Sequence, residues 1–254
     1  MIALPSILSR EEREAQMAIA IKSGFPFLRK ALPSADLGTI SIICYGPSLL
    51  ETWRDINRSD YLPVMTVSGA HDFLSERGLM PSYHVHLDPR PFEPEMLAAP
   101  NSHTRYLMAS VCPSGFWEIL KGRHVELWHM LNGPETVEWV RFNHSRGLKS
   151  MIGGGSTVGQ RAINVARALG YRKFRLYGMD FSFGYQHWAG PHPGNDEPLI
   201  SIEFRGKTYK TTPQLWKAAR EMVEFIETSD VELEFHGNGL MQDVAATLKR
   251  KKAL

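Results

Sequence analysis

The fold is decided by the stretch Gly153-Gly-Gly-Ser-Thr-Val-Gly-Gln-Arg-Ala-Ile-Asn-Val-Ala-Arg-Ala-Leu-Gly-Tyr-Arg-Lys-Phe-Arg-Leu-Tyr-Gly-Met-Asp180. Its pattern predicts a glycine-rich loop, an amphipathic helix over 156–169, a tight turn, and a buried strand over 173–177 followed by a carboxylate. This order brings backbone N–H groups, a helix N-terminus and an acid to one edge of a sheet. Open α/β folds bind phosphate-bearing ligands at such an edge.

Apolar, β-branched runs recur on both sides of this stretch and alternate with helical patterns. Strands are predicted at 39–45, 61–67, 81–88, 105–111, 124–130, 173–177 and 231–235, and helices at 9–32, 70–77, 156–169, 213–228 and after 239. The alternation indicates a mostly parallel sheet with helices on both faces. We therefore expect an α/β protein with a three-layer sandwich of modified Rossmann type.

The length of 254 residues is enough for one large α/β domain with an extension. We expect a helical extension over residues 1–38 and a Rossmann-like, donor-binding domain over 39–254. Residues 183–212 break the periodic pattern, which is typical of a functional loop or lid inside a compact domain. Within this segment a small hairpin is predicted over 203–209, with Arg205-Gly206-Lys207 at its tip.

Composition narrows the class of protein. The formal net charge is only +2, so no global basic field favours nucleic acid. The two cysteines lack metal-type spacing, which argues against structural zinc and for a reduced environment. No run reaches the roughly 18 apolar residues of a membrane helix, and the first residues lack the basic residues of a signal peptide. We expect a cytoplasmic protein without a membrane segment.

Two turns are candidates for binding a nucleotide. Gly46-Pro47-Ser48 follows the first predicted strand, and a sharp strand-to-helix turn lets the backbone approach a phosphate closely. The second turn is Gly154-Gly155-Ser156-Thr157, at the start of the helix predicted to end at Leu169. The hydroxyl of Ser156 or Thr157 can cap this helix, and Ser48 can cap the helix after the first strand in the same way. Neither turn has the Walker or the G-x-G-x-x-G spacing.

Charged side chains accompany these turns. Asp88 and Asp180 each close a predicted strand, where a carboxylate can accept ribose hydroxyls, bind Mg²⁺, act as a base, or only cap a turn. Arg90 lies beside Asp88 and is either its ion-pair partner or a phosphate clamp. Arg205 and Lys207 are further candidates for offsetting charge on a leaving phosphate.

The irregular segment carries the candidate general bases. His187 and His192 can each take a proton from an acceptor hydroxyl near neutral pH, although loop histidines are more often only exposed. With Asp196 nearby they also permit a metal site. Trp188 can stack on a base or a sugar ring. His84 and His86 share one face of a predicted strand, and they are interpreted first as residues that pack in the core or support a site from behind, and second as ligands.

Three segments taken together carry a family resemblance. They are Gly46-Pro-Ser-Leu49 after an apolar strand, Pro81-Ser-Tyr-His-Val-His-Leu-Asp88, and the run from Ser156-Thr-Val-Gly to Leu176-Tyr-Gly-Met-Asp180. Their ordered combination resembles the DUF115 family, which includes archaeal 6-hydroxymethylpterin diphosphokinase (MptE-like) proteins and the motility accessory factors of flagellin glycosylation. It is also similar to the bacterial sialyltransferases of glycosyltransferase family 42. The resemblance covers roughly residues 39–240.

The resemblance to the sialyltransferases implies that Gly46-Pro47-Ser48 and Gly155-Ser156-Thr157 hold the CMP part of a donor. It also implies a histidine base downstream of the Gly-x-Asp strand, in the region of His187 and His192. The sequence departs from these enzymes at Asp88-Pro89, which is closer to the DUF115 pattern. In the pterin kinases carboxylates would hold magnesium and ATP phosphates, and Asp88 and Asp180 would match them.

The favoured hypothesis is group transfer from a nucleotide-activated donor, most simply glycosyl transfer from a nucleotide sugar to an acceptor hydroxyl. The alternative is an MptE-like diphosphokinase that uses ATP and Mg²⁺ on a pterin-type alcohol. A third reading keeps the nucleotide pocket in a non-enzymatic binding module. The acceptor stays open among protein, lipid, glycan, small metabolite and nucleobase, and the oligomeric state also stays open.

Overall fold

The computed structural model describes residues 8–56, 61–192 and 198–252. Its centre is an eight-stranded parallel sheet with the strand order β10-β7-β1-β2-β3-β4-β5-β6. The strands of this sheet are β1 Thr39–Ile43, β2 Val64–Val67, β3 Tyr83–His86, β4 Arg105–Ala109, β5 His124–Met130, β6 Met151–Ile152, β7 Lys173–Tyr177 and β10 Glu232–His236. The expected fold class is confirmed.

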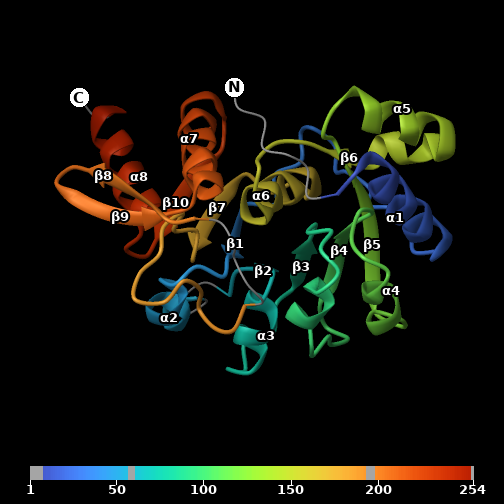
Figure 1. The fold of residues 1–254 in the computed structure, drawn as a ribbon, viewed down its shortest axis with the longest axis horizontal. Helices are drawn as coiled ribbons and strands as arrows, with labels where there is room; N and C mark the ends of the chain where they lie inside the picture. The colour runs from blue at the N-terminus through green and yellow to red at the C-terminus, as the bar shows by residue number, and fades with distance from the viewer. Residues whose placement is uncertain (1–7, 57–60, 193–197, 253–254) are drawn as a thin grey trace.

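Helices cover both faces of the sheet. They are α1 Arg10–Lys22, α2 Leu49–Thr52, α3 Ala70–Ser75, α4 Gly115–Ile119, α5 Pro134–Asn143, α6 Val158–Leu169, α7 Pro213–Thr228 and α8 Leu240–Lys252, with 3-10 turns at Trp53–Asp55, Glu93–Met96 and Ser145–Ser150. Helices α6 and α7 lie on one side of the sheet, and α2 and α3 lie on the other (Figure 1). This is the three-layer arrangement that an alternating pattern of strands and helices produces.

The chain changes direction within the sheet between β1 and β7. From β1 it adds strands on one side as far as β6, and α6 then carries it back to β7 on the other side of β1. Strands that diverge in this way leave a crevice at their carboxyl ends, and this switch point is where open α/β folds place ligands. The fold therefore puts the loops after β1 and β7 at the position where a site is expected.

The N-terminal helix is shorter than predicted. The sequence predicts a helix over 9–32, but α1 ends at Lys22 and Gly24 takes a φ of +79°. The chain then runs extended beside β5, where Leu28 N–H donates to Leu127 O over 2.8 Å and Leu127 N–H donates to Pro26 O over 2.8 Å. The prediction was wrong because a glycine in the left-handed region ends a helix.

Segment 183–212 contains the predicted hairpin. Strands β8 Ile200–Phe204 and β9 Lys207–Thr211 pair antiparallel, and the turn between them has a positive φ at both Arg205 and Gly206. This backbone is that of the two-residue turn which suits the twist of a hairpin. Within the same segment, residues 193–197, including Asp196, lie outside the described residues.

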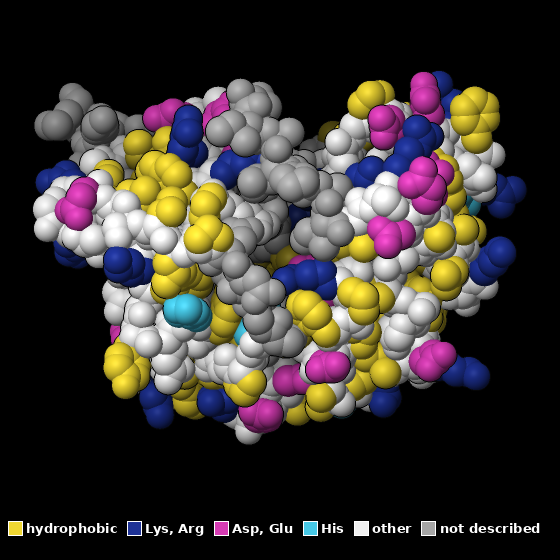
Figure 2. Space-filling model, in the orientation of Figure 1, with side chains coloured by type: hydrophobic (Ala, Val, Ile, Leu, Met, Phe, Trp, Pro, Cys, Tyr) yellow, Lys and Arg dark blue, Asp and Glu magenta, His cyan; other side chains and the backbone are white. Residues whose placement is uncertain are grey.

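The surface matches the modest net charge. Lysine, arginine and acidic side chains are interspersed on the face in Figure 2, rather than gathered by sign. Among the described helices, none combines the length and the apolar character needed to cross a bilayer.

A buried histidine makes stability depend on pH. The His129 side chain is fully buried between Ser110 Oγ, 2.7 Å from its Nδ1, and His144 Nδ1, 3.1 Å from its Nε2. Burial and the neighbouring His144 lower the pKa of His129 to about 3. Burial also lowers the pKa of His84. The unfolded chain therefore binds protons that the folded chain does not, and stability that is present above about pH 6.5 is lost as the pH falls toward 3.

We expect the free energy of unfolding to be lower at about pH 5 than at about pH 7.5, by roughly 2 kcal/mol from His129 alone. Urea denaturation at the two pH values measures the difference. A His129→Gln variant should show a smaller difference. Superimposed wild-type curves at the two pH values would contradict the prediction.

Candidate functional site

The loops after β1 and β7 lie so close together that Gly46 has no room for a side chain. Gly46 N–H donates to Gly178 O over 3.0 Å, and a Cβ atom on Gly46 would collide with that oxygen and lie 2.6 Å from Asp180 Oδ2. After β10, a Cβ on Gly239 would meet the backbone of Asp180 at 2.8 Å. These glycines are therefore required for close packing around Asp180. The sequence analysis missed Gly239.

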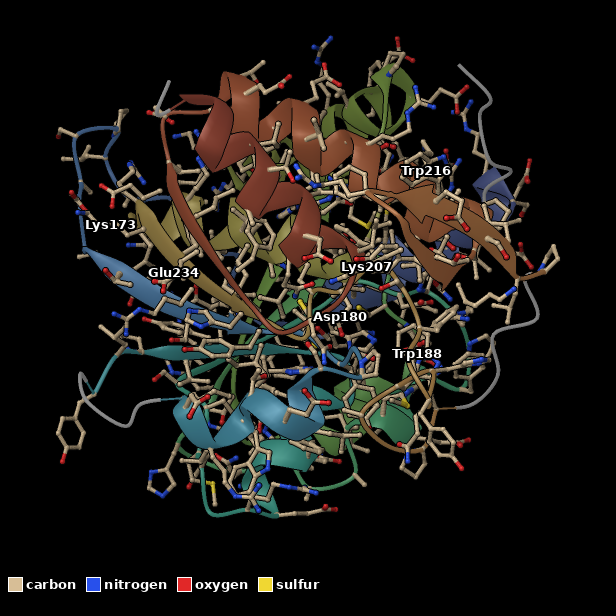
Figure 3. The ribbon with its side chains drawn as sticks, turned by 90° about the vertical axis from the view of Figure 1, so that its left-hand side faces the viewer. Lys173, Asp180, Trp188, Lys207, Trp216 and Glu234 are labelled. Atoms are coloured by element: carbon tan, nitrogen blue, oxygen red, sulfur yellow. The ribbon has the colours of Figure 1, made fainter. Side chains whose placement is uncertain are left out.

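Asp180 connects the loop after β7 to the turn after β1 and to the start of α8. Its side chain accepts hydrogen bonds from Ser48 N–H at 2.9 Å, Ser48 Oγ at 2.6 Å and Gln242 Nε2 at 3.0 Å. Burial raises the pKa of Asp180, and this effect outweighs the lowering by these donors. The Ser48 hydroxyl does not cap α2, contrary to the prediction, because the carboxylate takes it. In Figure 3, Asp180 lies near the centre of the view, and Trp188 lies on the loop that follows it.

The glycine-rich loop leads into α6, and α6 begins beside the end of β1. Gly154 and Gly155 have φ values of +84° and +78°, and Thr157 caps the helix by accepting a hydrogen bond from Gln160 N–H. In the first turn, a Cβ on Gly159 would lie 2.7 Å from the Sγ atom of Cys44. The start of α6, which follows the glycine-rich loop, therefore packs against Cys44 just after β1.

A glutamate of α7 occupies the glycine-rich loop. Ser156 donates to Glu221 Oε2 from its N–H at 3.1 Å and from its hydroxyl at 2.7 Å. The Lys217 Nζ atom lies 3.4 Å from the other oxygen of Glu221. A carboxylate held by a backbone N–H and a hydroxyl near a helix N-terminus has the chemistry of a bound anion. No local sequence signal pointed to Glu221, which lies 65 residues further along the chain.

Asp88 and Arg90 form an ion pair at the end of β3. The guanidinium donates to both carboxylate oxygens, at 2.9 and 2.7 Å, and its Nη2 also lies 3.0 Å from the buried Glu93. On the far side, Glu93 Oε2 lies 3.1 Å from Nε2 of the fully buried His86. Of the alternatives for Arg90, the structure shows the ion pair. His84 and His86 are buried side by side, as the packing interpretation expected.

The two aspartates are not brought together. Asp88 follows β3 and Asp180 follows β7, which are three strand spacings apart, or roughly 14 Å. One carboxylate is paired with Arg90 and the other is bonded to Ser48 and Gln242. In the described part of the chain no group of three metal-ligating side chains is assembled. The residues expected to hold Mg²⁺ therefore do not fit a shared ion in this arrangement.

The loop after β7 carries an aromatic cluster. Trp188 stacks on His192 with 4.5 Å between ring centroids, and the exposed His187 lies against Phe183 at 4.5 Å. The loop is tied to the end of β1, where Ala189 N–H donates to Tyr45 O over 3.0 Å. The structure thus places both candidate bases on a segment that is fixed to the loop after β1.

The hairpin cations lie beside α8. Lys207 Nζ is 2.7 Å from Asp243 Oδ2 in α8, and Tyr209 donates to the same oxygen. Arg205 and Lys207 line a hollow with α8, and no residue of the glycine-rich loop lines it. A clamp on the donor phosphate stays a prediction for both residues.

The strand order and the loops at the switch point define a Rossmann-like fold. A model of the family described as 6-hydroxymethylpterin diphosphokinase MptE-like matches residues 21–186. The chain belongs to this MptE-like family, so the resemblance seen in the sequence is confirmed.

A solved structure of a glycosyltransferase shares this fold. The MAf glycosyltransferase from Magnetospirillum magneticum AMB-1 superposes with a TM-score of 0.66 and 15% identity, over 99% of this chain and 43% of that one. A mammalian sialyltransferase gives 0.48 and 11%, over 92% and 87% of the two chains. The alpha-2,3-sialyltransferase Cst-I from Campylobacter jejuni gives 0.40 and 12%, over 96% and 82%. No curated protein sequence matches the chain.

Proposed function

We propose that this protein is a transferase that uses a nucleotide-activated donor, and that it moves a sugar from a nucleotide sugar to an acceptor hydroxyl. One observation carries the proposal: the start of α6 meets the loops after β1 and β7 at the switch point of the sheet, where Gly159 abuts Cys44. The similarity of the fold to that of the MAf glycosyltransferase supports the proposal of glycosyl transfer.

The glycine-rich loop is the proposed place for the donor phosphates. Ser156 already holds a carboxylate there through two hydrogen bonds. A phosphate would replace Glu221 on these donors, with its charge stabilised by the N-terminus of α6. The loop at Gly46-Pro47-Ser48 and the Trp188 indole would border the nucleoside and the sugar.

The transfer itself needs one proton acceptor and one leaving group. The acceptor oxygen forms a bond to the anomeric carbon of the donor sugar, and the bond from that carbon to the phosphate oxygen breaks. The phosphate keeps the electron pair and leaves with the nucleotide. His187 or His192 takes the hydroxyl proton, which an imidazole can do near neutral pH.

The second candidate is diphosphate transfer from ATP to a pterin-type alcohol, which the family match favours. In that reaction the alcohol oxygen attacks the β-phosphorus and AMP leaves. Mg²⁺ would neutralise the phosphates when bound. Asp88 and Asp180 do not offer Mg²⁺ a shared site.

A thermal-shift screen against CMP, UDP, GDP, ADP and ATP, with and without Mg²⁺, tests the proposal. A ligand at about 100 times its Kd should raise the melting temperature by roughly 5–10 °C, because it binds only the folded chain. Stabilisation by a nucleoside mono- or diphosphate without Mg²⁺ supports glycosyl transfer. Stabilisation by ATP only with Mg²⁺ supports the diphosphokinase.

A matched pair of variants locates the binding. Ser156→Ala removes the hydroxyl donor of the glycine-rich loop and should reduce the shift, whereas Ser34→Ala changes an exposed serine in the turn before β1 and should leave the shift unchanged. The proposal fails if none of the nucleotides stabilises the wild-type protein.

A further inference from the structure

One carboxylate bridges the glycine-rich loop and a lysine of α7. Glu221 Oε2 accepts hydrogen bonds from the N–H of Ser156 at 3.1 Å and from its hydroxyl at 2.7 Å, whereas Oε1 lies 3.4 Å from Lys217 Nζ. The side chains of Lys217 and Glu221 are 38% and 33% exposed, so solvent ions can reach the bridge. A phosphate also presents several oxygens and can contact both partners at once.

A buried arginine lies behind this loop and is held by neutral groups. Arg161 of α6 is 6% exposed. Its guanidinium donates to Gly155 O and Ile152 O at 2.9 Å each and to Asn132 Oδ1 at 3.3 Å. Burial lowers the pKa of Arg161 to about 10, and the attraction of Glu221 offsets this only in part. A buried cation with neutral partners favours an anion nearby, so the loop suits an anion of higher charge than one carboxylate.

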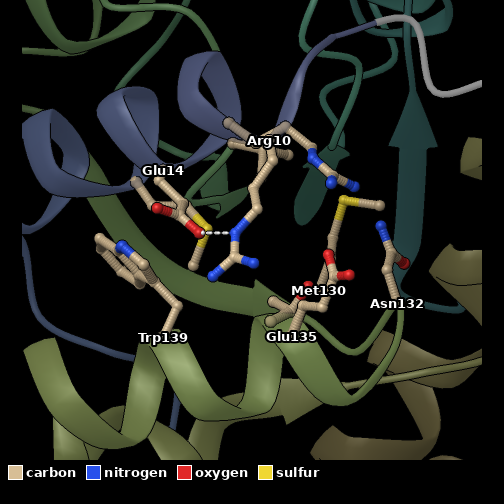
Figure 4. A pocket seen from close by; sticks show the side chains of 10 residues that line it. Arg10, Glu14, Met130, Asn132, Glu135 and Trp139 are labelled. Carbon is tan, nitrogen blue, oxygen red and sulfur yellow. Dashed lines mark hydrogen bonds and ion pairs between the residues drawn. The ribbon is translucent and has the colours of Figure 1, made fainter.

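A small hollow that Asn132 also lines cannot take such an anion. It lies between α1 and α5, and Arg10, Glu14 and Trp139 are among the residues around it (Figure 4). Its volume is about 20 Å³, which is room for about one water molecule and too little for a phosphate. Of the two places, the loop is the one that already holds an anionic group, the carboxylate of Glu221.

The two members of the α7 ion pair act in opposite ways on an incoming phosphate. Glu221 repels it and competes with it for Ser156, whereas Lys217 attracts it. Because the Glu221 side chain is partly exposed, a change of rotamer can turn its carboxylate into solvent while α7 stays in place.

We propose that Glu221 is a built-in competitor for the donor phosphate, and that Lys217, which the exchange releases, binds this phosphate together with Ser156. The inference rests on the proposed function for the identity of the donor. The exchange of one anion for another stands on the contacts of Ser156, Lys217 and Glu221 alone.

Isothermal titration calorimetry on the full chain, with inorganic pyrophosphate as the probe, tests the exchange. Glu221→Ala removes the competitor and should lower the Kd of pyrophosphate by about 10-fold, whereas Lys217→Ala should raise it by about 10-fold. Alanine favours helix, so both variants should keep α7. The matched controls are Glu227→Ala and Arg220→Ala, which remove the same charges from exposed positions of α7 and should leave the Kd nearly unchanged.

The opposite signs distinguish competition from an ion pair that only stabilises the structure. A structural pair predicts that both substitutions weaken pyrophosphate binding or leave it unchanged, and either result overturns the inference. A variant whose Kd does not move in its expected direction overturns the role of that residue. The exchange is also overturned if neither the wild type nor Glu221→Ala binds pyrophosphate.

The thermal-shift screen separates this inference from the proposed function. If nucleotides stabilise the wild type and Glu221→Ala binds pyrophosphate no more tightly, the exchange is overturned and the donor site stands. Opposite changes in the pyrophosphate Kd without any nucleotide shift leave the exchange and remove the transferase.

Discussion

Replacing Asp180 with alanine is expected to lower the free energy of unfolding by about 3–5 kcal/mol, because the change leaves three buried donors without an acceptor. These donors are the N–H and hydroxyl of Ser48 and the side-chain amide of Gln242. The carboxylate is 2% exposed, so water cannot take its place at the donors without opening the loops. Urea denaturation at constant pH measures the change.

Two companion variants make the result specific. Asp230→Ala removes a carboxylate that is 79% exposed and pairs with Arg167 at the surface, and it should cost less than about 1 kcal/mol. Ser48→Ala removes one of the three donors together with its bond, and should cost less than Asp180→Ala. An Asp180→Ala protein as stable as the wild type would show that the carboxylate does not hold the loops together.

Removing the catalytic base should lower kcat by about 100-fold or more, the usual contribution of general-base catalysis. We expect this loss in one of the two variants His187→Ala and His192→Ala, assayed with the donor nucleotide sugar that the thermal-shift screen identifies. The loss should fall on kcat rather than on the KM of the donor, because the base acts on the acceptor hydroxyl. The acidic limb of the pH–rate profile should disappear with it.

His124→Ala is the matched control for this pair. His124 begins β5, at the edge of the sheet opposite to the carboxyl ends, and its side chain is 61% exposed. Its removal should leave kcat unchanged. Full turnover in both loop variants would refute the assignment of the base to this loop.

The periodic parts of the fold were predictable and the short irregular parts were not. Helix α6 and strand β7 have clear patterns, and both were predicted close to their observed bounds. Strand β6 has two residues, and α4 has five, which is too little sequence for a period to show. The ten-residue α5 was also missed, because it carries only one fully buried residue, Val140, and hence no apolar stripe.

The candidate site divides in the same way. A parallel sheet brings the ends of its strands to one edge, so the convergence of Ser48 and Asp180 follows from the strand pattern. The positions of the residues that contact these loops from other helices do not follow from the strand pattern. Gln242 and Glu221 come from helices 62 and 65 residues further along the chain than their partners, and no local pattern marks either contact. Only tertiary packing selects them.

Strand β10 lies beyond the residues that match the family, and it limits how much of the chain can be removed or exchanged. The family match ends at residue 186, but Gly239 and Gln242, which enclose Asp180, come after β10. A fragment cut at the end of the match would lack β10 and would leave β7 as an unpaired sheet edge, which promotes aggregation. It would also lack the residues after β10 that contact Asp180. The region that can be exchanged between proteins as one piece therefore extends through α8.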